Sequence, residues 1–98
     1  MVRIVETDGE IVELVATTEN GEVRVITGMS KEGDALHLRG LHIDGPGVGS
    51  LGRVGLRNLA VELGKQQGAK QVIILGGTRT TGANPGQIPR PIRFLVGD

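Results

Sequence analysis

Groups able to bind an anion are concentrated in residues 76–91 of this 98-residue chain. The segment joins two apolar runs, residues 72–75 and 92–96, and a connection of this length without structure of its own is usually functional. Beside several glycines it contains three hydroxyls and two cations: Thr78, Arg79, Thr80, Thr81 and Arg90. Hydroxyls and backbone amides donate hydrogen bonds to phosphate oxygens, and arginine binds them in a bidentate manner. The segment therefore predicts an anion site; the alternative is a rigid surface loop whose arginines are solvated.

A second polar set lies in residues 35–43, where the alternation of apolar and polar residues breaks at Gly40. Strict alternation would place Leu41 and Ile43 on the polar side of a strand. A β-bulge at Gly40 would return both residues to the core. It would also bring three polar side chains onto one surface: His37, Arg39 and His42. The alternative is an uninterrupted strand in which His42 is buried and hydrogen-bonded.

The two sets together predict a metal-independent ribonuclease, in which the 2′-hydroxyl of RNA attacks the adjacent phosphate. Histidine titrates near neutrality, so His42, with His37 as a second choice, is the candidate for proton transfer. Arg79 would hold the phosphate and stabilise its charge, and Thr80 and Thr81 would donate hydrogen bonds to it. Further substrate contacts are assigned to His37, Arg39, Thr78 and Arg90. This chemistry requires no cofactor and no metal.

Length and composition argue against several other classes. We expect one domain over residues 1–98. Phe94 is the single aromatic residue, which argues against RNA recognition by base stacking. With no cysteine and two histidines, a structural zinc site is not expected, and the acidic residues are too concentrated near the N-terminus for a two-metal nuclease. No apolar run reaches the roughly 18 residues of a membrane span, and no signal-peptide core is present, so we expect a soluble domain without membrane contact.

Charge is distributed unevenly along the chain. Residues 1–34 contain eight acidic and three basic residues, a net charge of −5, whereas residues 35–98 contain three acidic and eight basic residues, a net charge of +5. This division favours a polyanionic or phosphate-bearing partner for the later half. Two alternatives stay open. The halves could be solvated and fold against each other, or the acidic part could dock to a partner in a non-enzymatic interaction domain that lacks an exposed aromatic anchor.

The remaining sequence predicts an α+β domain in the order β-β-β-β-α-β-β, with a mainly antiparallel, twisted sheet packed by one helix. Turns at Gly9, Gly21 and Gly33 separate short β-like runs and predict a meander. One amphipathic helix is expected over residues 50–67, with Ser50 as its N-cap and Gly68 as the left-handed residue after its end. Residues 72–75 are almost wholly apolar, which indicates a strand covered on both faces.

Three sequence segments resemble the C-terminal tip domains of bacterial polymorphic toxins of the Rhs and contact-dependent inhibition type. They are LHIDG at residues 41–45, QQGA at residues 66–69 and GGTRTTGANPG at residues 76–86, within a similarity over about residues 29–93. Many such tips resemble the barnase, EndoU, colicin and RelE group of ribonucleases. The resemblance implies cleavage of RNA or tRNA without metal, delivery as the tip of a larger secreted protein into the cytoplasm of a target cell, and a cognate immunity protein. Active-site residues vary in that group, so only His42, Arg79, Thr80 and Thr81 are carried over.

A second resemblance leads to a different activity. A strand ending near Asp44, a GVGS turn at residues 47–50, an amphipathic helix and a strand after Lys70 are similar to the coenzyme A binding segment of GNAT acetyltransferases. In that family, backbone amides at the helix N-terminus bind pyrophosphate. This resemblance implies a coenzyme A binding domain or an acetyltransferase fragment.

Overall fold

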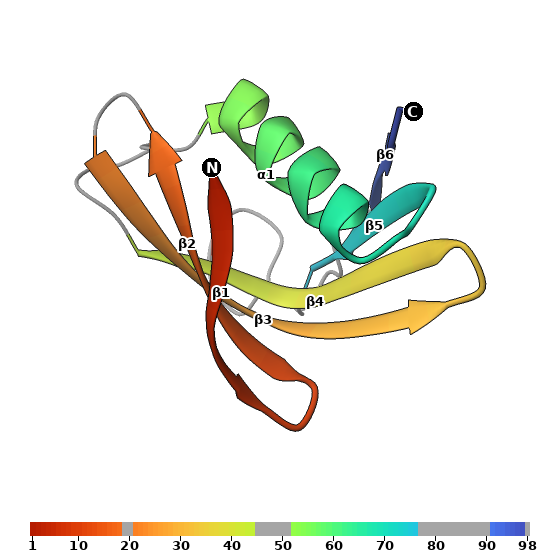
Figure 1. The fold of residues 1–98 in the computed structure, drawn as a ribbon, viewed down its shortest axis with the longest axis horizontal. Coiled ribbons are helices and arrows are strands. Elements are labelled where there is room, and N and C mark those ends of the chain that lie inside the picture. Colours follow the sequence, from red (N-terminus) through yellow and green to blue (C-terminus); the bar gives the residue numbers. More distant parts are fainter. Residues whose placement is uncertain (19–20, 45–51, 77–90, 98) are drawn as a thin grey trace, which may run out of the picture.

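The computed structural model describes residues 1–18, 21–44, 52–76 and 91–97. They form one six-stranded sheet, in which the strands lie in sequence order, and one helix (Figure 1). Every neighbouring pair of strands is antiparallel except β4 and β5, which are parallel. The predicted α+β class and element order are thus confirmed. The elements are β1 (Val2–Asp8), β2 (Ile11–Thr18), β3 (Gly21–Glu32), β4 (Ala35–Asp44), α1 (Gly52–Gln66), β5 (Gln71–Leu75) and β6 (Ile92–Leu95).

Glycines form the tight turns of the meander where the sequence predicts them. Gly9 and Gly33 adopt φ angles of +61° and +60°, a conformation that costs glycine little. Asp8 pairs with Ile11 and Glu32 with Ala35, so each turn is two residues long and fixes the register of its hairpin. Figure 1 shows the β1–β2 and β3–β4 hairpins pointing in clearly different directions, as the twist of a sheet requires.

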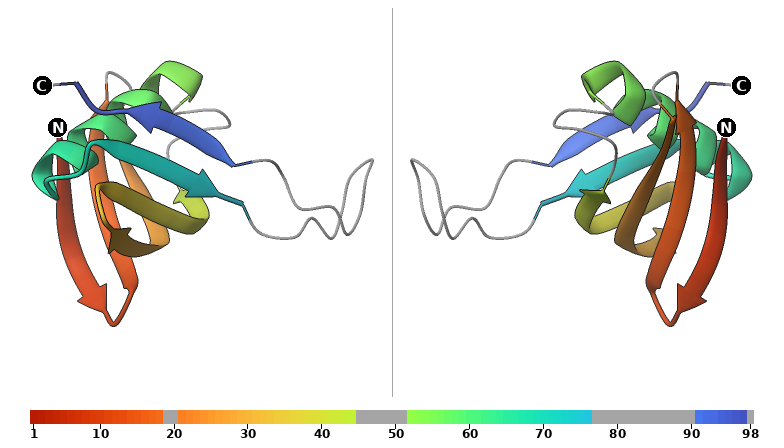
Figure 2. Two further views of the ribbon diagram at one scale, coloured as in Figure 1. Left: turned by 90° about the vertical axis from the view of Figure 1, so that its right-hand side faces the viewer. Right: turned by 90° about the vertical axis from the view of Figure 1, so that its left-hand side faces the viewer.

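Helix α1 makes the crossover between the parallel strands β4 and β5 and covers one face of the sheet (Figure 2). Its apolar side buries Leu59, Ala60 and Leu63, as the spacing of these residues predicts. Gly64 faces β5 so closely that a Cβ atom there would lie 2.8 Å from Val72 Cγ2. Gly68 has φ +70°, which confirms the predicted helix end, whereas Ser50 lies outside the described residues.

The core lies between α1 and the sheet and is aliphatic. Its sheet side is formed by alternate residues of each strand, among which Leu14, Val23, Val25, Leu36, Leu38 and Val72 are at most 1% exposed. The expectation that β5 is covered on both faces is met only in part. Val72 and Ile74 are buried beneath α1, but Ile73 and Leu75, which point to the opposite face, are only half-buried. A run of apolar residues does not by itself show that both faces are covered.

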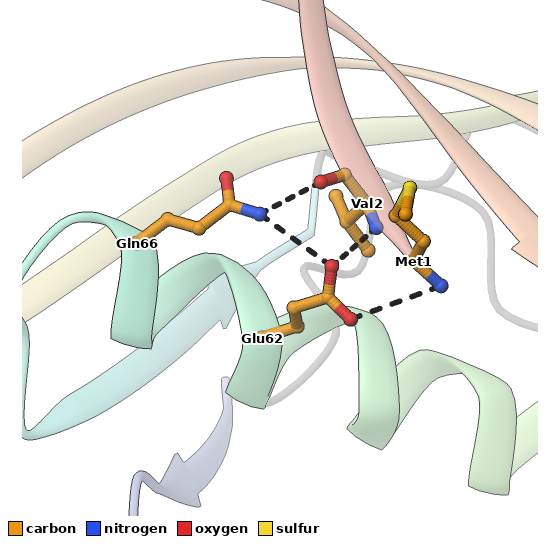
Figure 3. A network of polar contacts seen from close by, with 4 residues as sticks. All are labelled: Met1, Val2, Glu62 and Gln66. Carbon is orange, nitrogen blue, oxygen red and sulfur yellow. Dashed lines mark hydrogen bonds and ion pairs between the residues drawn. The ribbon is translucent and has the colours of Figure 1, made fainter.

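Side chains of α1 bind the backbone of the edge strand β1 (Figure 3). The Val2 N–H donates to the carboxylate of Glu62, and Gln66 Nε2 donates to the Val2 carbonyl oxygen at 2.7 Å. Glu62 Oε1 also lies 3.8 Å from the Met1 nitrogen. These contacts satisfy backbone groups that an edge strand otherwise leaves without a partner. They also orient the Glu62 carboxylate toward β1.

Candidate phosphate-binding face of the sheet

The predicted bulge in β4 is present at Gly40. Arg39 pairs with Gly28 and His42 pairs with Ile26, so three steps along β4 lie opposite two steps along β3. The extra residue is accommodated by Gly40, whose φ of +61° is unfavourable for residues with a Cβ atom. Because side chains alternate between faces, this one residue decides on which side of the sheet His42 lies.

A buried threonine on β3 holds the bulge. Thr27, opposite the bulge, is 2% exposed and is the one buried polar residue among those described. Its hydroxyl lies 3.0 Å from the carbonyl oxygen of Arg39 and 3.2 Å from that of Gly28, and donates to them. A bulge interrupts the ladder and frees backbone groups that need other partners. Thr27 supplies such a hydrogen-bond partner. The sequence did not reveal this role, because a β-branched residue on the inward side of a strand is expected to be an ordinary core residue.

The bulge brings the three predicted polar residues of β4 to the face opposite α1, here called the open face. Residues paired across antiparallel strands point to the same face, and on β3 and β4 the open face consists of Arg24, Ile26, Gly28, Ser30, His37, Arg39, His42 and Asp44. At about 3.4 Å per residue, Arg39 and His42 are about 7 Å apart along the sheet, and His37 and His42 about 14 Å. Arg39 and His42 can therefore contact one phosphate, whereas His37 is too far from His42 to share it.

The apolar residues after the bulge follow the prediction only in part. Leu41 is half-buried and packs against the core, as expected. Ile43 pairs with Val25 and points toward the core side, yet it is 38% exposed. The expectation that Ile43 is buried is wrong, because among the described residues this end of β4 extends beyond the area that α1 covers.

The two histidines have different environments. His42 is exposed, so the alternative of a buried, hydrogen-bonded His42 is wrong. The His37 side chain is 18% exposed, and its Nδ1 lies 3.9 Å from Glu32 Oε2. This Nδ1 and the hydroxyl of its neighbour across the ladder, Ser30, are buried and make no hydrogen bond. Of the two histidines, His42 has the accessibility that proton exchange with a substrate requires.

Most arginines of the open face form ion pairs with carboxylates. Arg39 Nη1 lies 3.5 Å from Glu10 Oε1, and Arg24 Nε lies 3.5 Å from Glu13 Oε2. Both members of the Arg39–Glu10 pair are well exposed, and such a surface pair contributes about 0–1 kcal/mol. A phosphate could therefore displace Glu10 at little cost. Arg93 of β6 points to the same face and is level with His37, because both residues pair with Ile73 of β5. Among the described residues no carboxylate forms an ion pair with Arg93.

The predicted residues of the long connection, Thr78, Arg79, Thr80, Thr81 and Arg90, lie outside the described residues. The strands that bracket it are described. Leu75, the last residue of β5, is in register with Arg39, and Ile92, the first of β6, pairs with Ile74. The end of β5 and the start of β6 therefore lie at the level along the sheet where the bulge of β4 begins. The carboxyl ends of adjacent parallel strands are a common place for ligands in open sheets.

No metal centre is evident in the part of the chain that the structure describes. It contains no group of three or more His, Asp or Glu residues that could hold an ion. Within the same residues no helix has the length and hydrophobicity needed to cross a bilayer.

Comparison with protein-family models, with curated proteins and with solved structures finds no match for this chain. Function is therefore inferred from the residues and geometry of the open face.

Proposed function

We propose that this protein is a metal-independent ribonuclease of the polymorphic-toxin type, which cleaves RNA or tRNA on the open face of its sheet. One observation carries the proposal: His42 and Arg39 lie about 7 Å apart on the same accessible side of β4. An imidazole and a guanidinium at this spacing can act on a single phosphodiester, one by moving a proton and the other by stabilising negative charge.

In the proposed reaction, His42 removes the proton of the RNA 2′-hydroxyl. The 2′-oxygen then forms a bond to the adjacent phosphorus while the bond from phosphorus to the 5′-oxygen breaks. The proton finally passes to the 5′-oxygen, which leaves as a hydroxyl, and the other product ends in a 2′,3′-cyclic phosphate. Arg39 leaves Glu10 to bind the phosphate. Arg79, Thr80 and Thr81 stay predicted contacts to the same phosphate, with His37, Thr78 and Arg90 as contacts to the flanking RNA.

The test is incubation of the purified protein with total RNA and with tRNA in excess EDTA, followed by analysis of the product ends. Discrete fragments ending in 2′,3′-cyclic phosphate are expected, and Arg79→Ala should abolish them while the free energy of unfolding changes by no more than about 0.5 kcal/mol. Arg3→Gln, which alters a cation of the same face on β1, three strands away from His42, is the matched control and should keep activity. Intact RNA with the folded wild-type protein would refute the proposal.

A second candidate is a coenzyme A binding domain or acetyltransferase fragment. It is favoured by the parallel pair β4 and β5, the crossover α1 between them, and the bulge at the point where their pairing ends. Titration calorimetry with acetyl-coenzyme A decides this candidate: saturable heat together with intact RNA in the nuclease assay would replace the ribonuclease by this function.

A further inference from the structure

The outer side of α1 carries a row of cations on the layer opposite His42. Arg53, Arg57 and Lys65 are all exposed. At 1.5 Å and 100° per residue they extend about 18 Å along the helix and lie within about one third of its circumference. We call these three residues the helix stripe. They belong to the basic later half of the chain, yet they lie on a different surface from Arg39.

The helix stripe differs from the open face in how its charges are balanced. Arg3, Arg24 and Arg39 of the sheet lie 3.5 Å from carboxylates, whereas no ion pair among the described residues involves the helix stripe. Glu62 is the one acidic residue of α1, and Figure 3 shows its carboxylate turned toward Met1 and Val2. The positive potential of the stripe is therefore not cancelled by its own helix.

Two of these three cations do not stabilise the helix itself. Arg53 lies in the first turn, which contains no acidic residue, and the partial positive charge of a helix N-terminus repels cations. Lys65, in the last turn, is favourably placed by the same rule. Arg53 and Arg57 bring no gain to α1 and have no carboxylate partner among the described residues, so both are available to contact an external anion.

A groove adjoins the helix stripe on the side of β1 and β2. It has a volume of about 520 Å³ and is lined by Met1, Thr17, Arg57, Asn58, Val61, Glu62 and Lys65. The Glu62 carboxylate in this lining accepts from the Val2 N–H and lies 3.8 Å from the Met1 nitrogen. Two cations, an amide and a hydroxyl all can donate hydrogen bonds to phosphate or sugar oxygens. The groove thus joins the charge of the stripe to a concave, hydrogen-bonding surface.

We propose that the helix stripe and its groove bind the phosphate backbone of RNA without reading its sequence. A nucleic acid fits better than a protein partner, because the described outer side of α1 has no aromatic residue to anchor a protein interface, whereas backbone binding needs only cations and donors. The inference rests on the proposed ribonuclease function and extends it. Because α1 covers the other face of the sheet, the stripe contacts RNA away from the bond that is cleaved.

The test measures binding of an oligoribonucleotide whose 2′-hydroxyls are methylated, so that it cannot be cleaved. Fluorescence anisotropy over a range of salt concentrations compares the wild-type protein with a variant combining Arg53→Gln, Arg57→Gln and Lys65→Gln. Glutamine is a good helix former, so α1 should persist, as circular dichroism can verify. The plot of log K against log salt should become shallower by about 2, because each phosphate contact to a single strand contributes about 0.7 to its slope.

The matched control removes a cation of β1 that lies on the other face of the sheet, three strands away from β4. Arg3→Gln should leave the salt slope unchanged. In cleavage assays the helix variant should raise KM and keep kcat, because contacts made equally in ground and transition states affect binding alone.

An unchanged salt slope in the helix variant would overturn the inference. So would a wild-type protein that binds polyglutamate but not the methylated RNA, since the stripe would then fit an acidic protein. The inference and the proposed function fail separately. If RNA binding depends on the helix stripe but ordinary RNA is not cleaved, only the proposed ribonuclease function is refuted. If RNA is cleaved but the salt slope of the helix variant is unchanged, only RNA binding by the helix stripe is refuted.

Discussion

The two halves of β4 belong to the same strand but have different surroundings. Residues 35–39 pair with β3 on one side and β5 on the other, and within them Leu36 and Leu38 are at most 1% exposed. Residues 42–44 pair with β3 alone among the described strands, and all three are exposed. Gly40 marks the border. The first half is held by neighbours on both edges and by α1, whereas the second half is accessible to a ligand.

A small domain can thus position a candidate site without a separate element to carry it. A bulge changes the facing of every later residue, so one inserted residue converts a core strand into a support for His42. Substitutions in the first half should therefore act on stability. Substitutions in the second half should act on function, and those at the bulge should act on both.

Leu38→Ala should have the largest effect on stability. The side chain is fully buried between α1 and the sheet, and truncating such a leucine costs about 2–5 kcal/mol in lost burial and cavity formation. Ile43→Ala is the matched truncation in the second half. Its side chain is 38% exposed, so the cost should stay below about 1.5 kcal/mol. Urea denaturation of both variants checks this, and equal losses would contradict the proposed division of β4.

Thr27→Val should have the second largest effect and lower the free energy of unfolding by about 1–3 kcal/mol. Valine keeps the shape but removes the hydroxyl that donates to Arg39 and Gly28, leaving a buried carbonyl without that partner. Thr27→Ser keeps the hydroxyl and is the control. If Thr27 holds the bulge, RNA cleavage should also fall in the valine variant under conditions where it is fully folded. Full activity in that variant would show that the bulge does not depend on this bond.

Gly40→Ala should lower the free energy of unfolding by about 1–2 kcal/mol. No atom lies within 4 Å of the position that a Cβ would occupy, so the cost comes from the φ angle of +61° and not from a clash. Gly28→Ala makes a useful contrast. Its Cβ would meet Arg39 atoms at 3.6 and 3.7 Å, which are ordinary contacts, and its φ angle lies outside the left-handed region. That variant should be neutral or slightly stabilising, and thermal denaturation of the pair tests whether Gly40 is a conformational requirement.

The sequence predicts these features of the fold because they are local. The phase break at Gly40 is visible in the order of apolar and polar residues, the turns are marked by glycines with positive φ, and the face of α1 follows from spacing. The exposure of Ile43 and of the outward side of β5 could not be predicted from such patterns. The exposure of Ile43 depends on how far α1 extends over the sheet, and that of the outward side of β5 depends on what covers the face opposite α1.

The facing of the β4 residues could be predicted from the sequence, but their contacts could not. Alternation combined with one bulge places His37, Arg39 and His42 on one face of the sheet. The partnership of Arg39 with Glu10 and the bond from Thr27 arise from the register of separate strands, which side-chain types alone do not specify. The residues assigned to the long connection stay predictions, because Thr78, Arg79, Thr80, Thr81 and Arg90 lie outside the described residues.

His42→Ala should have the smallest effect on stability and a large effect on function. The side chain is exposed, so the free energy of unfolding should change by about 0.5 kcal/mol or less, while loss of a general base should reduce kcat by about 10²–10⁴-fold. His37→Ala removes the imidazole of the first half, which is 18% exposed and about 14 Å from His42. It should therefore retain most of kcat and affect mainly KM. Single-turnover cleavage and urea denaturation of both variants decide the assignment: if His37→Ala loses kcat and His42→Ala does not, the reacting phosphate lies beside the paired half of β4, and the bulge does not position the catalytic residue.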